Sequence, residues 1–269
     1  MLVTVALTPR LVPSVDHSVC IVLDVLRASS TMLAMFEAGA SALYLAATPG
    51  EAARTAAADR AAHWVCGERD GLRPEGFDYG NSPSDLANAR LAGRRVVYVT
   101  SNGTNALRAV AAAPLVLIGT PRNEVAVTRL AVREARDRDL DMLIVCAGDE
   151  GGYAISLEDT FVAGMLVDRL IKLHARHVPV EEVDGDPEAL SLDESAILVH
   201  RAFGTYLRGP DAHVTPETLL TVFGESRNGR DLPRKGYADD LVYCAQVDVS
   251  TVVPRLEVRD GTLAVVAGV

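Results

Sequence analysis

Short apolar runs alternate with longer segments of helical spacing along this sequence, and this alternation restricts the fold more than any other feature. Each run is followed by a polar turn and then by a helix-like segment, and the clearest runs lie at 18–25, 41–47, 94–100, 115–120 and 141–148. They are nearly continuous in valine, isoleucine and leucine, as expected for strands that helices cover on both faces. The pattern predicts an α/β fold with a mostly parallel sheet flanked by helices.

The end of the sequence has a different pattern. Segments 240–250 and 253–269 contain alternating runs and an Asp-Gly pair, which indicates an antiparallel hairpin near the C-terminus. The stretch 178–195 is the least apolar, and we expect a mobile segment or a subdomain boundary there. The sequence contains no internal repeat or low-complexity linker, so residues 1–269 are expected to form a single domain.

Composition excludes several classes of function. A formal net charge of −10 disfavours binding to nucleic acid or to an anionic membrane. The sequence lacks the features of a signal peptide and any apolar stretch of about 18 residues, the length that a membrane span needs. Cys20, Cys66, Cys146 and Cys244 are far apart and are expected to be buried and reduced. We therefore expect a cytoplasmic protein, and a homodimer is compatible with the sequence.

Polar side chains follow four of the predicted strands at the point where each strand ends. They are Asp24, Arg27 and Ser29–Thr31; Glu68 and Arg69, which follow a short strand in HWVCGERDG (63–71); Ser101, Asn102, Gly103 and Thr104; and Glu158 and Asp159 at the start of a helix. In open α/β sheets, ligands bind at the carboxyl ends of the strands, where such residues converge. The combination of acids, arginines, hydroxyls and glycines predicts a metal-assisted site for a phosphate or a carboxylate.

Each of these residues also has an explanation that needs no ligand. The hydroxyl-rich turns fit helix N-caps, and acidic residues are favoured in a first helical turn. Asp24 is harder to explain in this way, because it ends an apolar strand in which an unpaired carboxylate is costly to bury. Carboxylate and hydroxyl oxygens favour a hard ion such as Mg²⁺. The sequence has no P-loop motif, no second aspartate two residues after Asp24 and no zinc-type histidine spacing.

Several segments together resemble the 2-phosphosulfolactate phosphatases of the ComB type. They are DVLRASST (24–31), GERDG (67–71) with GFDYGNSP (76–83), TSNGTNAL (100–107), the segment 146–159, and the spacing of Ser226, Gly229, Leu232, Gly236, Asp240, Cys244, Asp248 and the Val-Pro pair at 253–254. The resemblance runs from about residue 18 to residue 254 in the same order. Ser30 stands where the family usually has a threonine, and Ser101 stands where it usually has a threonine or an asparagine. Both serines keep the polar character of their positions.

The resemblance implies an α/β, Mg²⁺-dependent acid phosphatase that removes phosphate from 2-phospho-3-sulfolactate, a step toward coenzyme M. With the strand-end reasoning it suggests Asp24, Glu68 and Asp159 as metal ligands, and Glu158 as a reserve ligand or base. Ser101, Asn102, Gly103 and Thr104 would hold the phosphate at a helix N-terminus, where Gly103 would allow close approach of the backbone or a positive φ. Contacts to the substrate are expected from Arg27, Arg69, Asn81, Ser82, Arg227 and Asn228, the last two as part of a lid.

Three questions stay open from the sequence. The nucleophile is either a metal-bound water or a carboxylate such as Asp24. The substrate could be another small phosphorylated acid, because the sulfonate contacts are inferred. The chain could also be a non-enzymatic anion-binding module, although carboxylates at the strand ends would repel an anionic ligand.

Overall fold

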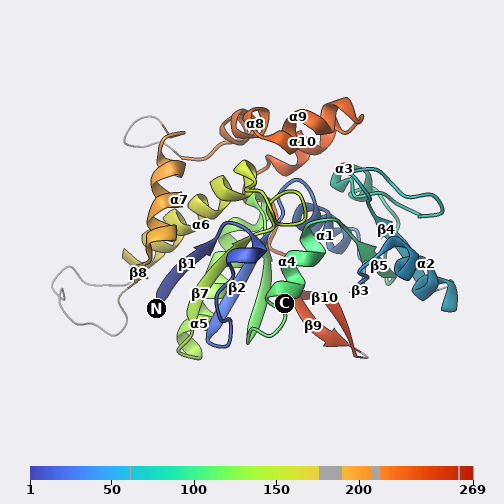
Figure 1. The fold of residues 1–269 in the computed structure, drawn as a ribbon, viewed down its shortest axis with the longest axis horizontal. Coiled ribbons are helices and arrows are strands. Elements are labelled where there is room, and N and C mark those ends of the chain that lie inside the picture. The colour runs from blue at the N-terminus through green and yellow to red at the C-terminus, as the bar shows by residue number, and fades with distance from the viewer. Residues whose placement is uncertain (61, 176–189, 208–212, 260, 269) are drawn as a thin grey trace.

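The computed structural model describes residues 1–60, 62–175, 190–207, 213–259 and 261–268, and in these residues helices flank one ten-stranded sheet (Figure 1). The strands are β1 (Leu2–Ala6), β2 (Ser18–Leu23), β3 (Ala42–Leu45), β4 (His63–Gly67), β5 (Arg95–Val99), β6 (Leu115–Gly119), β7 (Asp141–Cys146), β8 (Ser191–Leu192), β9 (Val253–Arg259) and β10 (Thr262–Gly268). The predicted α/β class is confirmed.

The helices follow the strands closely along the chain. They are α1 (Ala28–Glu37), α2 (Pro49–Ala58), α3 (Pro83–Leu86), α4 (Gly103–Ala109), α5 (Glu124–Asp137), α6 (Leu157–Ala175), α7 (Glu194–Gly204), α8 (Pro216–Glu225), α9 (Arg227–Arg234) and α10 (Ala238–Cys244), with 3₁₀ turns η1 (Pro9–Leu11) and η2 (Pro121–Asn123). Thr48 caps α2 by accepting from the Glu51 N–H, and Pro49 takes the first helical position, where its missing N–H costs nothing. No helix in the described part of the chain is both long and apolar enough to cross a bilayer.

The sheet consists of two parallel groups joined by an antiparallel hairpin. Its strand order is β4-β5-β3-β10-β9-β6-β2-β7-β1-β8. Within the groups β4-β5-β3 and β6-β2-β7-β1-β8 the neighbouring strands are parallel, whereas β9 and β10 pair antiparallel with each other and with β6 and β3. The predicted C-terminal hairpin is therefore confirmed. It lies in the middle of the sheet, where it connects both parallel groups (Figure 1).

Several segments differ from the sequence-based expectation. The run at 240–250 was expected to be extended, but its first residues form α10, because Asp240 and Cys244 are buried four positions apart as on one helix face. The N-terminal strand β1 and the helices α8 and α9 were not predicted. Of the stretch 178–195, residues 178–189 lie outside the described residues, and Ser191–Leu192 pair with β1 as β8.

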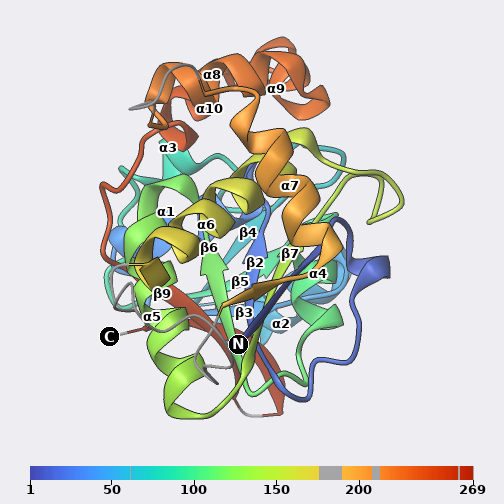
Figure 2. The same cartoon turned by 90° about the vertical axis from the view of Figure 1, so that its left-hand side faces the viewer.

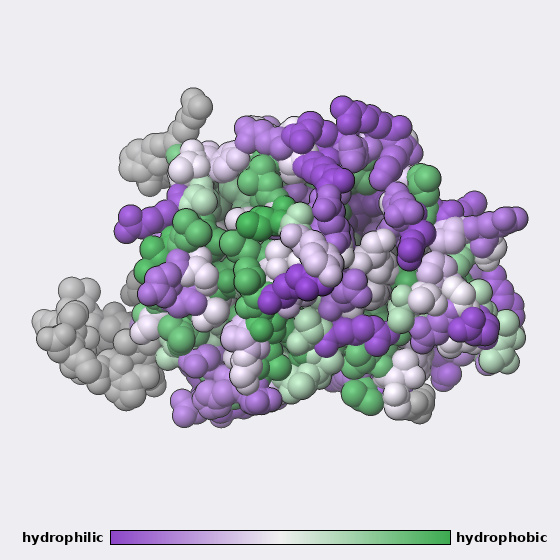
Figure 3. All heavy atoms as spheres, viewed as in Figure 1, coloured by the Kyte–Doolittle hydropathy of each residue, from purple (hydrophilic) through white to green (hydrophobic). Residues whose placement is uncertain are grey.

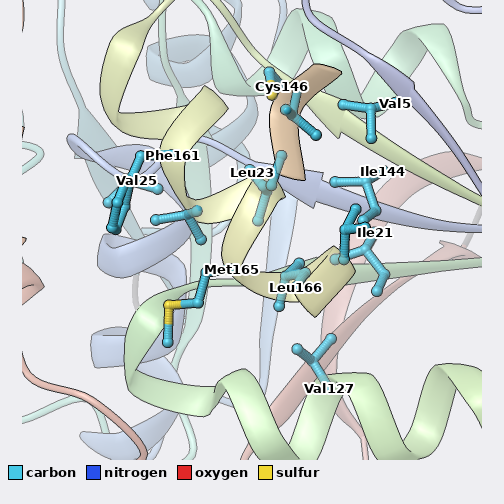
Figure 4. Close-up of a cluster of buried hydrophobic side chains, with 14 of the residues drawn as sticks. Val5, Ile21, Leu23, Val25, Val127, Ile144, Cys146, Phe161, Met165 and Leu166 are labelled. Atoms are coloured by element: carbon cyan, nitrogen blue, oxygen red, sulfur yellow. The ribbon is translucent and has the colours of Figure 1, made fainter. Parts of the chain in front are cut away.

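Helices on both faces explain the continuous apolar runs. Ile21 and Leu23 of β2 pack against α5 and α6 on one face, as Figure 4 shows, while Cys20 and Val22 point into the cluster beside α1 on the other. All four side chains are fully buried. Because both faces of β2 are covered, an alternating pattern would leave polar groups in the core.

Helices α8, α9 and α10 form a separate layer above one end of the sheet (Figure 2). Leu219, Val222 and Phe223 of α8 are buried and join the core cluster of α6 and α7. Ser226 caps α9 by accepting from the Gly229 N–H at 3.0 Å. This layer therefore has its own anchor in the core and faces the carboxyl ends of the strands.

Candidate active site

A cavity of about 570 Å³ lies between the carboxyl ends of β2, β4 and β5 and the helix α9. The surface is hollowed beneath α9, and hydrophilic side chains surround the hollow (Figure 3). Nine of the residues proposed from the sequence line it, namely Asp24, Arg27, Glu68, Arg69, Asn81, Ser101, Asn102, Arg227 and Asn228. The other five, Ser82, Gly103, Thr104, Glu158 and Asp159, lie behind its walls and are buried.

Asp24 is held at the end of β2 by the first turn of α1. Its Oδ1 accepts from the Ala28 N–H at 3.0 Å, and its own N–H donates to Ser29 Oγ at 2.9 Å. Gly103 packs directly against this carboxylate, since a Cβ built there would lie 2.8 Å from Asp24 Oδ2 and 2.5 Å from Ala28 Cβ. The φ of Gly103 is not positive, contrary to one of our expectations. A glycine is needed here because of the close approach to Asp24.

Glu68 connects the loops that follow β4 and β5. Its Oε2 accepts from the Gly71 N–H at 2.7 Å, and its Oε1 accepts from the Ser101 N–H. The preceding Gly67 has φ +143°, and a Cβ there would lie 2.0 Å from the Val99 carbonyl oxygen. Only glycine therefore allows β4 to approach β5 closely enough for Glu68 to bridge the two loops.

Glu158 and Asp159 begin α6 beneath the cavity. Asp159 accepts from the N–H groups of Val25 at 2.8 Å and Gly148 at 3.2 Å, so it joins the loops after β2 and β7. Glu158 accepts from Asn228 Nδ2 at 2.9 Å, which links α6 to α9. Both side chains therefore connect elements that are far apart in the sequence.

Burial and mutual repulsion perturb these carboxyl groups. Desolvation, followed by repulsion from Glu68, Glu158 and Asp149, raises the pKa of Asp24 to about 7, although the Ala28 N–H opposes the shift. Burial and then the charges of Glu158 and Asp24 raise the pKa of Asp159, and burial raises that of Glu158. Negative charge is therefore concentrated here without enough neighbouring cations to offset it.

Arg27 lies at the cavity wall in a buried ion pair. Its guanidinium donates to Asp240 Oδ2 at 2.7 Å and to the Gly71 carbonyl at 2.9 Å, and it stacks over the Tyr237 ring at 4.3 Å. The second oxygen of Asp240 accepts from Ser82 Oγ at 2.7 Å. Arg27 and Ser82 therefore attach the C-terminal helices to the strand-end loops.

The turn after β5 satisfies backbone groups at the start of α4 and also forms part of the cavity wall. Thr104 Oγ1 donates to the Thr100 carbonyl at 2.7 Å, and its N–H donates to Thr100 Oγ1 at 3.2 Å. Asn102 Oδ1 accepts from the Gly151 N–H at 2.9 Å. Nearby, Asn81 Oδ1 accepts from the Tyr98 hydroxyl at 2.5 Å. Of the four residues predicted to hold phosphate, only Ser101 and Asn102 line the cavity.

Sequence reasoning did not identify five charged residues that line the cavity, the first of which is Asp70 in the loop after β4. Asp149 and Glu150 follow β7, and Arg227 forms ion pairs with both. Asp231 and Lys235 come from α9 and its C-terminal cap, opposite the strand ends. The only sequence signal for Asp231 and Lys235 is the high density of charged residues in RNGRDLPRKG at 227–236. An argument that considers only the residues after each strand cannot identify cavity residues that come from a helix on the opposite side.

The four cysteines offer no nucleophile. All are free and buried, as predicted. Burial raises the thiol pKa of Cys20 and of Cys244 to about 12, and also raises that of Cys66 and Cys146. Thiols with raised pKa values are not the reactive thiolates of cysteine-dependent phosphatases.

Comparison with known proteins identifies the family to which this sequence is similar. The family described as 2-phosphosulpholactate phosphatase matches residues 6–259. A probable 2-phosphosulfolactate phosphatase of Thermus thermophilus is 37% identical over 90% of this chain and 90% of its own length. Proteins of the same name from Thermosynechococcus vestitus and Deinococcus radiodurans are each 34% identical, over 92% and 93% of this chain and 93% and 94% of their own. The chain therefore belongs to the 2-phosphosulfolactate phosphatase family.

Proposed function

We propose that this protein hydrolyses the phosphate monoester of 2-phospho-3-sulfolactate, giving 3-sulfolactate and phosphate. The observation that carries the proposal is the charged cavity at the strand ends, in a chain whose relatives are named for this reaction. We also propose that this step leads toward coenzyme M, as the resemblance implies. Four buried, unpaired cysteines fit a reducing compartment, and we propose the cytoplasm.

The charge of the cavity supports a requirement for a cation. The substrate carries about four negative charges at neutral pH, since the second pKa of a phosphate monoester lies near 6. Within the described residues, six carboxylates and four cationic side chains line the cavity. These side chains alone would repel such a substrate. We propose Mg²⁺, for which carboxylate oxygens are suitable ligands.

The carboxylates suit this ion in their chemistry, although they do not form a ready-made cage. Among the described residues, no three His, Cys, Asp or Glu side chains converge to hold a metal. Mg²⁺ is usually bound by one or two carboxylates, with waters and substrate phosphate completing its shell. Asp24 and Glu68 line the cavity and would provide those carboxylates, while Asp159 fixes the loops behind them. When bound, the ion would neutralise charge on the transferring phosphoryl group.

The protein's own residues would then orient the substrate and move a proton. Ser101 and Asn102 would contact the phosphate from the turn after β5. In one route a water held beside the phosphate attacks phosphorus, and a carboxylate of the site accepts its proton. In the alternative route the Asp24 carboxylate attacks phosphorus and the ester P–O bond breaks, so that 3-sulfolactate leaves with a proton on its oxygen; water then cleaves the acyl phosphate, which releases phosphate and restores the carboxylate. Glu158, held by Asn228, is the reserve base.

A panel of substrates tests the proposal. Initial rates would be measured with Mg²⁺ on 2-phospho-3-sulfolactate, 2-phospholactate, 3-phosphoglycerate and p-nitrophenyl phosphate. We expect kcat/KM to be highest for the sulfonated acid. A higher value for another member would make the protein a phosphatase for that acid. A folded protein that hydrolyses none of them, with any divalent ion, would instead be an anion-binding module.

A further inference from the structure

The four cations of the cavity fall into two pairs. Arg27 is 4% exposed, and its partner Asp240 is fully buried. Arg227 forms ion pairs with Glu150 and with Asp149. These two arginines already have carboxylate partners, so an incoming anion would have to compete with those partners.

The other two cations, Arg69 and Lys235, differ from Arg27 and Arg227 in their partners. Both line the cavity, both are exposed, and neither forms an ion pair with any residue that the structure describes. Lys235 Nζ donates to the Asp70 carbonyl at 3.0 Å. An ammonium has three donors, so this contact leaves two for a ligand. Lys235 is therefore fixed at the cavity wall while most of its binding capacity is unused.

The loop after β4 brings these two cations together. Asp70 has φ +57° and the next residue, Gly71, has φ +79°, which turns the Asp70 carbonyl toward Lys235. A Cβ on Gly71 would lie 2.8 Å from Lys235 Nζ, so the ammonium rests directly on the backbone of this loop. The loop also begins with Glu68, whose carboxylate reaches the Ser101 N–H. The cations thus lie beside the proposed phosphate end of the cavity.

We infer that Lys235, together with Arg69, binds the sulfonate of the substrate and determines the preference for a sulfonated acid. This inference rests on the proposed phosphatase function. A sulfonate is fully ionised at neutral pH and presents three acceptor oxygens, which suit an ammonium and a guanidinium that lack other anionic partners. Lys235 would act in substrate recognition and take no part in moving the phosphoryl group.

The decisive variant is Lys235→Met, with Arg230→Met as a matched control. Arg230 is an exposed cation of α9, the helix that Lys235 caps; it donates to the Glu225 carbonyl and does not line the cavity. Lys235→Met should raise KM for 2-phospho-3-sulfolactate on the order of 10- to 100-fold, the usual effect of losing a hydrogen bond to a charged group. kcat and the melting temperature should stay near wild type, and Lys235→Arg should recover part of the loss. Arg230→Met should behave as wild type.

Two further substrates identify the anion. 2-Phospholactate lacks the sulfonate, and p-nitrophenyl phosphate lacks both the sulfonate and the carboxylate, so KM for each should be unchanged in Lys235→Met. An equal rise for 2-phospholactate would overturn the sulfonate assignment: it would assign Lys235 to the carboxylate if KM for p-nitrophenyl phosphate is unchanged, and to the phosphate if that KM rises as well. An unchanged KM for the sulfonated substrate would also overturn it.

A binding measurement separates this inference from the proposed function. Titration calorimetry with 3-sulfolactate should show weaker binding to Lys235→Met than to wild type, whether or not turnover is observed. If wild type hydrolyses no phosphate ester, the proposed function fails, while this difference would still support the anion site. Equal affinities would overturn the inference, even in an active enzyme.

Discussion

Replacing Asp240 with asparagine should destabilise the protein strongly while barely changing the volume of the side chain. Asp240 is fully buried and accepts from Arg27, from Ser82 Oγ and from Ser84 Oγ, each at 2.7 Å. The variant would leave the guanidinium of Arg27, which is 4% exposed, without a counter-charge. An uncompensated buried charge is among the most costly defects that a single substitution can create.

The expected size follows from the burial of both partners. Removing one member of a buried ion pair costs about 3–5 kcal/mol of unfolding free energy. Because each kcal/mol shifts the melting temperature of a chain of this length by about 2–4 °C, the fall should be on the order of 6–20 °C. Arg60→Met gives the control, because Arg60 pairs with Asp78 at the surface with half of its side chain exposed. Breaking an exposed pair costs about 1 kcal/mol or less.

Scanning calorimetry and steady-state kinetics on the same samples would complete the test. KM should rise in Asp240→Asn, because α10 helps to hold α9, with Asn228 and the capping residue Lys235, at the cavity. The double variant Arg27→Met/Asp240→Leu should recover much of the stability, since apolar side chains of similar volume often replace a buried ion pair at little cost. A melting temperature lowered no further than in Arg60→Met would refute the reasoning.

Four further predictions follow from the site. Chelation with EDTA should abolish turnover and Mg²⁺ or Mn²⁺ should restore it, whereas full activity after exhaustive chelation would contradict the metal proposal. Cys66→Ser and Cys146→Ser should each retain substantial turnover; a loss of about a thousandfold in a folded variant would implicate a thiol. Gly103→Ala should lower the unfolding free energy by about 1–3 kcal/mol and reduce kcat, because its Cβ would collide with Ala28 and with Asp24, and unchanged values would disprove this. Burial raises the pKa of Asp24 from 3.8 to about 7, so the folded state binds this proton more tightly, and stability in metal-free buffer should fall as pH rises from about 4 to 7. The melting temperature of Asp24→Asn should therefore exceed that of wild type at pH 8 but not at pH 4. An equal difference in melting temperature at the two pH values would contradict the raised pKa of Asp24.

The sequence allowed the strand ends to be predicted more fully than the contacts made there. Asp24 and Glu68 could be found because a carboxylate after an apolar run lies at the carboxyl edge of a parallel sheet. The partner of Arg27 lies 213 residues away in Asp240, so their contact depends on how the C-terminal helices dock. Lys235 was missed for the same reason, since it enters from a helix above the sheet. Local spacing predicts elements and their ends, whereas side-chain partners depend on packing between distant segments.

The central position of the β9–β10 hairpin has a consequence for how the protein is synthesised. Leu43 and Tyr44 of β3 pair with β10, and Leu117 of β6 pairs with β9, so a nascent chain shorter than about 250 residues leaves both strands as open edges. Open edges pair readily with other chains, which should make prematurely released polypeptides prone to aggregate and to bind chaperones. The loops bearing Asp24 and Glu68 belong to different parallel groups, and the sheet connects them only once the hairpin has left the ribosome. Catalytic activity would then appear only in chains whose translation has passed the final strand.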